Sequence, residues 1–216
     1  GGEVLHLTSN AKQKINPLQI FSEEILSADE AVTNLDDLVK DKIQRIKGFF
    51  EVLKSDMTQV EKAIMDGVVK QAYINSGVLK YERLSDIAND QWPTLSNVYD
   101  ELTKLKERDV EKFELIREFY YILSSYTNGS NTLFDGHTNI DLTAKIVSFD
   151  LKPLQSEQEV QAGAYLTTFQ YLWDEITKDR HTRKKLFVDE FHFLTLHKAA
   201  ATFFHQAYKR FRKYNA

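Results

Sequence analysis

The chain has 216 residues, of which 42% are hydrophobic and 28% are charged, as in an ordinary globular protein with one core or two small ones. The absence of cysteine excludes a disulfide framework, a thiolate nucleophile and a Cys-based zinc site. The net charge of −4 argues against a protein that binds nucleic acid over its whole surface, and no apolar run approaches the ~18 residues of a membrane span.

The first residues predict a strand. The stretch "EVLHLT", Glu3–Thr8, alternates in polarity and is rich in residues that favour strands. Because the chain opens directly on this pattern without an initiator Met, we expect residue 1 to lie inside a larger domain. Asn16-Pro17 is a turn signal. Residues 1–20 are therefore expected to form a first core strand and its connection.

Residues 21–125 predict an all-α region, because the apolar period changes there from two to about 3.6. Two capping boxes, Ser27 with Glu30 and Thr58 with Glu61, mark helix starts. Gly77 is a plausible helix end. Four amphipathic helices are expected, with apolar stripes at Ala31, Leu35, Leu38, Val39, Ile43, Ile46 and Phe50; at Val60, Ile64, Val68 and Tyr73; at Leu95, Val98, Leu102 and Leu105; and at Val110, Phe113, Ile116, Phe119 and Leu123.

Residues 126–216 predict an α/β segment. A stretch rich in Asn, Gly, Ser and Asp (126–137) breaks the helical pattern. A strand at 144–151, a helix starting at a Ser156–Glu159 box, a strand at "KKLFVDE" (184–190) and a helix over 193–212 follow in order. Strands of this apolar kind that alternate with helices favour a parallel sheet buried on both faces.

Two acidic positions stand at the expected carboxyl ends of these strands. Asp150 ends the first, and the adjacent Asp189 and Glu190 end the second. Ligands of open α/β sheets bind at that edge. In an ATPase, such an Asp orients Mg²⁺ and such a Glu polarises the attacking water. The pair could equally be a polar strand end and an anionic helix start, and a metal-dependent hydrolase using all three carboxylates is a weaker alternative.

The last helix is strongly basic. Its cations could neutralise charge on a phosphate, within the chain or across a subunit interface. They could also bind nucleic acid or simply favour the carboxyl end of the helix. No GxxxxGK[ST] loop exists in the chain, so the backbone cradle for nucleotide phosphates is missing from it. The histidines follow no familiar zinc spacing. The basic residues are Lys198, Lys209, Arg210, Arg212 and Lys213.

Several segments, in order, resemble the conjugal-transfer ATPases of type IV secretion systems, the VirB-four type. They are "GGEVLHLT…INPLQIF", "MTQVEKAIMDGVVKQAY", "PTLSNVYDEL", "TLFDGHTNIDL", "KIVSFDLK", "LFVDEFHFL" and "KRFRKYNA". The resemblance covers nearly the whole chain and is to the C-terminal, RecA-like motor domain. It implies an α/β fold: an incomplete RecA-like P-loop NTPase parallel sheet with a large all-α insertion at 21–125.

The resemblance also implies roles for residues. Asp189 would bind Mg²⁺ through water, Glu190 would activate water, and Arg210, Arg212 and Lys213 would face phosphates. The phosphate-binding loop would lie upstream of residue 1, and a Gln-containing motif would follow "RKYNA". Where such families often have a small residue after the acidic pair, this chain has Phe191.

The implied parent uses ATP and Mg²⁺ to power conjugative DNA transfer or type IV secretion. We expect this chain alone to bind neither and to be inactive. The implied partners are further copies of the parent, the membrane subunits of the secretion system and DNA. The implied location is the cytoplasmic, inner face of the bacterial membrane. The alternative is a non-catalytic helical module that binds nucleic acid or protein through its basic C-terminal helix.

Overall fold

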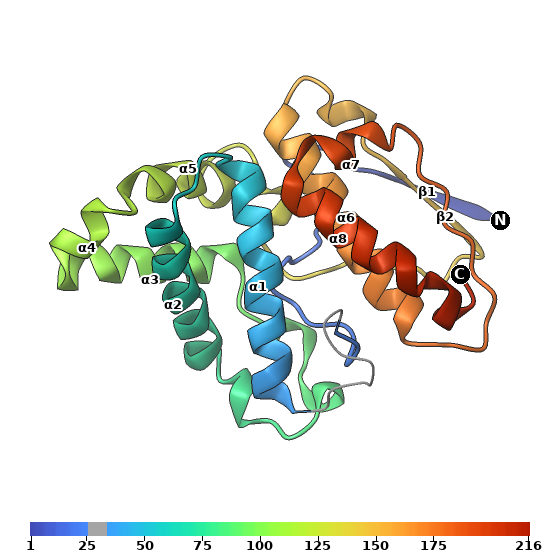
Figure 1. The fold of residues 1–216 in the computed structure, drawn as a ribbon, viewed down its shortest axis with the longest axis horizontal. Coiled ribbons are helices and arrows are strands. Elements are labelled where there is room, and N and C mark those ends of the chain that lie inside the picture. The colour runs from blue at the N-terminus through green and yellow to red at the C-terminus, as the bar shows by residue number, and fades with distance from the viewer. Residues whose placement is uncertain (26–33) are drawn as a thin grey trace.

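The computed structural model describes residues 1–25 and 34–216, and it contains a small parallel sheet among many helices (Figure 1). Strand β1 (Gly2–His6) pairs in parallel with β2 (Ile146–Asp150), with His6 opposite Asp150. Both strands and the parallel sheet were predicted, but the sequence did not predict that these two strands would be direct neighbours. Leu5 is buried on the inner face of the sheet, while the outer face exposes Val4.

The α-helical region consists of α1 (Leu35–Leu53), α2 (Gln59–Ser76), α3 (Leu95–Arg108), α4 (Val110–Glu114) and α5 (Arg117–Thr127). The predicted box at Thr58 and Glu61 caps α2, and Gly77 ends it in the left-handed conformation with φ of 80°. The predicted box at Ser27 and Glu30, and the stripe residue Ala31, lie outside the described residues. Within them, α1 begins after Asn34, whose side chain accepts a hydrogen bond from the Asp36 amide.

The fourth predicted helix is two helices. The helix is interrupted at Leu115 and Ile116, between α4 and α5. Val110, which was assigned to the apolar stripe, is 61% exposed. Asp109 caps α4 by accepting a hydrogen bond from the Lys112 amide. The division itself has no such cap, because α5 begins after Ile116 without a side-chain hydrogen bond.

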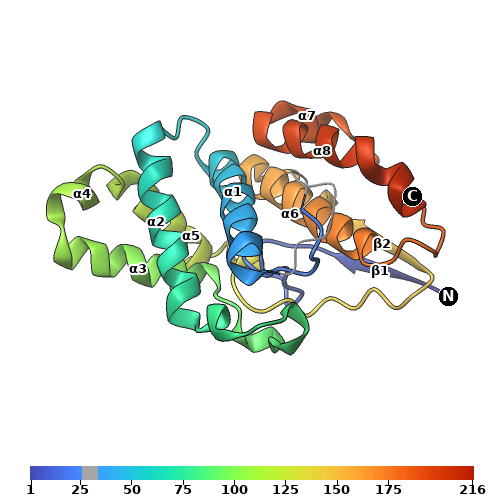
Figure 2. The same cartoon turned by 60° about the horizontal axis from the view of Figure 1, so that its bottom comes forward.

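Helix α6 (Gln158–Thr177) lies at the centre of the molecule, between the sheet and the C-terminal pair α7 (His192–Leu196) and α8 (Lys198–Phe211) (Figure 2). It also packs against α1. Because it has neighbours on several sides, it is buried almost throughout. Its predicted cap is wrong: the N-cap is Glu157, not Ser156, and no side chain caps it. The single predicted helix at 193–212 is likewise divided at His197, whose backbone is extended.

The predicted strand at 184–190 is not a strand in the structure. Residues 183–188 belong to no strand or sheet of the described chain, and the Lys184 amide donates instead to the Asn215 carbonyl. Burial still alternates along the segment: Leu186 and Val188 pack against the core, whereas Phe187 is 86% exposed. The segment thus has the side-chain pattern of a strand without its ladder.

Three of the quoted sequence segments meet at Asn16, which is only 1% exposed. Its side chain donates to the Pro93 carbonyl and accepts from the Leu18 amide, and its amide donates to the Thr138 hydroxyl. These bonds join "INPLQIF" to the first residue of "PTLSNVYDEL" and to the middle of "TLFDGHTNIDL". Buried polar groups need such partners, so this residue fixes the connection between the sheet and the helical region.

Candidate functional site

The predicted acidic pair lies on a tight turn between the extended segment and α7. Asp189 and Glu190 are both exposed. The Asp189 side chain accepts a hydrogen bond from the Glu190 amide at 2.8 Å, and the Glu190 carbonyl accepts from the Phe193 amide at 3.0 Å. Glu190 has a φ of 49°, which costs a residue with a side chain about 1–2 kcal/mol. The turn therefore presents two carboxylates to solvent on a strained backbone.

Aromatic rings surround this turn. The Phe191 ring contacts that of Phe204 in α8, with centroids 4.3 Å apart, and the Phe193 ring stacks on Tyr165 of α6 at 5.9 Å. Burial, and then the charges of Glu190 and Asp189, raise the pKa of Tyr165. The Tyr165 hydroxyl of α6 therefore lies close enough to both carboxylates to interact with them electrostatically.

Asp150 lies at the carboxyl ends of the paired strands, as predicted. One carboxylate oxygen is 2.8 Å from Nδ1 of His6 and the other accepts from the Lys152 amide. These two contacts, the amide first, lower the pKa of Asp150. The carboxylate is thereby fixed within its own sheet edge, and sequence reasoning did not find its His6 partner.

The basic residues with an implied role, Arg210, Arg212 and Lys213, lie at the carboxyl end of α8, whereas Lys198 lies at its other end, next to α7 (Figure 1). Arg210 donates to the Ile25 carbonyl at 3.1 Å, while Arg212 and Lys213 are exposed. With a rise of about 1.5 Å per residue, the helix between Lys198 and Arg210 separates the two ends by about 18 Å. Within one chain, the structure does not bring the acidic pair and the basic residues together.

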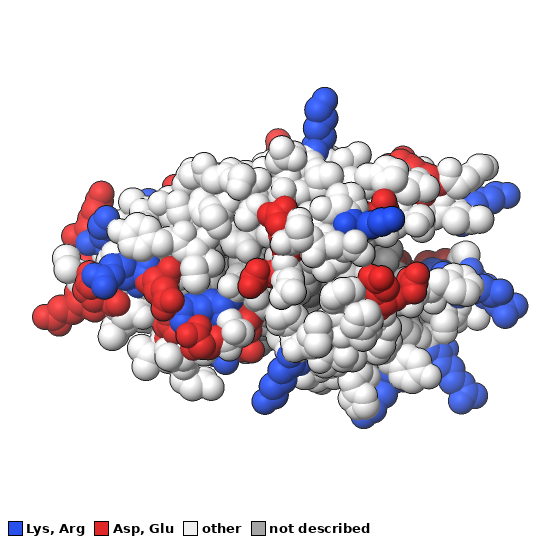
Figure 3. Space-filling view, turned by 90° about the horizontal axis from the view of Figure 1, so that it is seen from above, with Lys and Arg blue, Asp and Glu red and all other residues white. Residues whose placement is uncertain are grey.

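Charge is unevenly distributed along the chain. Residues 178–216 hold ten of the 28 Lys and Arg residues but only three of the 32 Asp and Glu residues. Figure 3 shows Lys and Arg predominating at the end of the molecule that carries the strands and the C-terminus, whereas acids and bases mix at the α4 end. The C-terminal segment is therefore a cationic region on an otherwise acidic protein.

The described residues include no cluster of three or more potential metal ligands. Asp150, Asp189 and Glu190 therefore do not form the metal-dependent hydrolase site that was considered. A single carboxylate can still serve Mg²⁺, which keeps several waters and binds substrate phosphates. Asp189 thus fits the edge of a Mg²⁺–nucleotide site, but the chain offers no glycine-rich cradle for the phosphates.

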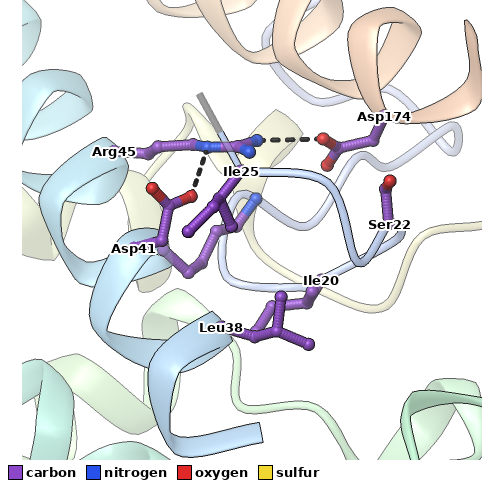
Figure 4. Close-up of a pocket in the computed structure, with 8 residues that line it drawn as sticks. Ile20, Ser22, Ile25, Leu38, Asp41, Arg45 and Asp174 are labelled. Carbon is purple, nitrogen blue, oxygen red and sulfur yellow. Dashed lines mark hydrogen bonds and ion pairs between the residues drawn. The ribbon is translucent and has the colours of Figure 1, made fainter. Parts of the chain in front are cut away.

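A buried charge cluster, which the sequence did not reveal, joins the helical region to α6 (Figure 4). Arg45 of α1 is 2.9 Å from Asp174 of α6 and 3.1 Å from Asp41, and its guanidinium also lies over the Phe203 ring. Beside it, burial lowers the pKa of Lys42 to about 8. The four charges border a cavity of about 10 Å³, the size of one water. The available signal was Asp174, which directly follows the apolar residues "YLW" within a largely apolar helix.

A groove of about 680 Å³ lies elsewhere, between residues 19–24, 84–92 and 177–181. None of the predicted site residues lines it. Its wall includes Gln19, whose Oε1 is buried without a hydrogen bond. The groove therefore supports no part of the predicted acidic and basic site.

None of the described helices combines the length and the apolar sequence that crossing a bilayer requires. No protein-family model matches the chain, and comparison with curated proteins gave no match. Among solved structures, VirB4 of Thermoanaerobacter pseudethanolicus superposes with a TM-score of 0.83 and 25% sequence identity. The match covers 98% of this chain and 55% of that one, so this chain spans about half the length of its structural relative. The likeness confirms the resemblance found in the sequence: over nearly its whole length, the chain is similar to a VirB4-type ATPase of type IV secretion systems.

Proposed function

We propose that this chain is the part of a type IV secretion ATPase that supplies the acidic edge of the nucleotide site. The observation that carries the proposal is the exposed Asp189–Glu190 turn at the end of a strand-like segment, in a fold that matches VirB4 over 98% of the chain. In this role Asp189 holds Mg²⁺ through water and Glu190 polarises the attacking water. ATP and Mg²⁺ then belong to the parent protein, which would provide the phosphate cradle.

The RecA-like architecture is part of this proposal. Residues 183–188 have strand-like alternation of burial but belong to no sheet of the described chain, in which the Lys184 amide donates to the Asn215 carbonyl. The alternation suits a further strand of a larger parallel sheet. We infer the same division as the sequence suggested: core strand and connection at 1–20, helical insertion at 21–125 and α/β core segment at 126–216.

The basic residues fit a role across a subunit boundary better than one within the chain. Arg210 lies about 18 Å along α8 from Lys198, and the acidic pair precedes α7, which leads into the Lys198 end of α8. Self-association of the parent would allow them to face the phosphates of a neighbouring copy, where cations neutralise developing charge. Membrane subunits of the secretion system are the further partners, which would place the parent at the inner face of the membrane.

ATP binding tests this function. We expect the 216-residue chain to bind ATP weakly or not at all, and the longer parent polypeptide that includes a GK[ST] loop to bind and hydrolyse it. In the parent, Glu190→Gln should abolish hydrolysis while it preserves binding. The exposed and unrelated Glu111→Gln serves as the matched control. A parent polypeptide that ignores ATP would refute the motor assignment.

The cationic C-terminal segment favours one second candidate, a nucleic-acid-binding module. If this is the function, the short chain binds DNA with an affinity that falls steeply with salt. Substitution of Arg210 and Arg212 by Ala should then abolish binding, whereas substitution of Lys104 and Lys106 on α3 should not. Absence of any salt-dependent binding would eliminate this candidate.

A further inference from the structure

The turn that carries Glu190 is held in a conformation that its residue type disfavours. In the described residues, Glu190 and Asn215 are the non-glycine residues with positive φ. Asn enters the left-handed region several-fold more readily than most residues, so Asn215 needs no special explanation. Glu190 does need one, because such strain persists only where the surroundings enforce it.

Two anchored residues flank the turn. Val188 packs against the core before it, and the Phe191 ring packs against Phe204 after it. Only the two acidic residues lie between these anchors, and α7 begins at the next position, His192. The chain must therefore change from extended to helical within two residues, and it does so by turning at Glu190.

We propose that Phe191 is a positioning residue for Glu190: its contact with Phe204 enforces the left-handed turn that fixes the direction of the Glu190 carboxylate. The proposal rests on the role proposed above for Glu190 in activating water. It also explains the departure at this position, where the resemblance leads one to expect a small side chain. Here the ring itself serves as the anchor, and Phe193 on Tyr165 supports the same turn from the side of α6.

A comparison of Gly with Ala at position 190 tests the enforced turn in the 216-residue chain. Gly tolerates the left-handed region, whereas Ala pays its full cost. We expect Glu190→Gly to have a folding equilibrium constant about fivefold or more above that of Glu190→Ala, as measured by urea unfolding. In the Phe191→Ala background the advantage of Gly should disappear. Phe191→Leu provides the background if Phe191→Ala does not fold.

The matched control is Asp189, whose φ is not positive, so that Gly there should be less stable than Ala. An equal advantage of Gly at position 190 with and without the Phe191 ring would overturn the proposal. The proposal would also be overturned if Glu190→Gly were no more stable than Glu190→Ala in the 216-residue chain that keeps Phe191.

Hydrolysis by the full-length parent provides the functional arm. We expect Phe191→Ala to lower kcat about tenfold or more with KM for ATP unchanged, and Phe191→Tyr to restore it. Phe191→Ala added to Glu190→Gln should cause no further loss of hydrolysis, because both changes act through one carboxylate. Additive losses would overturn the positioning role. If the parent hydrolyses no ATP, the proposed function fails, whereas the Gly–Ala comparison still decides whether Phe191 enforces the turn.

Discussion

Removing the carboxylate of Asp174 should destabilise the protein more than any change at the acidic pair. Its side chain is 4% exposed and that of its partner Arg45 is 9% exposed. Breaking a buried pair by removing one partner costs about 3–5 kcal/mol, because the remaining charge stays buried. Asp41 still contacts the guanidinium at 3.1 Å, so we expect a loss near the lower limit, about 3 kcal/mol.

Equilibrium urea unfolding of Asp174→Ala at pH 7, followed by circular dichroism, measures this loss. The matched control is Asp66→Ala, which removes a carboxylate 2.8 Å from Lys47 with 41% of its side chain exposed. Exposed pairs contribute about 0–1 kcal/mol, so the two variants have similar pair distances and differ in burial. If Asp174→Ala lost no more stability than Asp66→Ala, the cluster would not be the electrostatic joint between α1 and α6 that its geometry indicates.

Three further predictions concern α1, α2 and the ends of helices. Because burial lowers the pKa of Lys42 from 10.5 to about 8, its charge penalises the folded state below pH 8, and the penalty disappears as the pH rises toward 10.5. Between these pH values, the free energy of unfolding of the wild type should therefore rise by on the order of 3 kcal/mol relative to that of Lys42→Met. Unfolding free energies of the two proteins that change in parallel with pH would contradict this. Thr58→Ala removes the capping box of α2 and should lower the free energy of unfolding by about 1 kcal/mol. Ser156→Ala, which removes no cap, should leave it nearly unchanged. Equal effects of the two substitutions in thermal melts would show that the cap contributes nothing. Gly67 is exposed within α2 with open space around it, whereas Gly77 has a φ of 80°. Gly67→Ala should therefore stabilise the protein by about 0.5–1 kcal/mol, and Gly77→Ala should destabilise it by about 1 kcal/mol. Changes of the same sign for both variants in urea unfolding would refute the assigned conformations.

The sequence predicted most of the helices because their apolar residues recur at helical spacing over long stretches. Leu95, Val98 and Leu102, for example, are all completely buried in α3. Both β1 and β2 were also recognisable as short apolar runs, but their direct pairing was not, because their residues are 144 positions apart. Helix starts were less predictable: Asp109 caps α4 through its side chain, whereas α6 begins after Glu157 with no side-chain cap at all.

The candidate site was predictable in composition but not in geometry. The sequence predicted Asp189 and Glu190 at the end of a strand of the parallel sheet, but the described chain pairs no strand with this segment. Nor could it show that Arg210 donates to the Ile25 carbonyl, because residues 185 positions apart in sequence meet only in the folded molecule. The left-handed turn at Glu190 was similarly invisible, since it arises from the packing of Phe191 and not from the residue itself.

The pairing of β1 with β2 has a consequence for the order of events during synthesis. Each residue of β1 meets a partner 144 positions further along the chain. At about 5–20 residues per second, the ribosome needs roughly 7–30 s to produce that partner. During this interval the helical region can fold, while Leu5 and Leu7 of the nascent first strand await their sheet. Chaperones that recognise short apolar segments therefore have a longer opportunity at β1 than at β2.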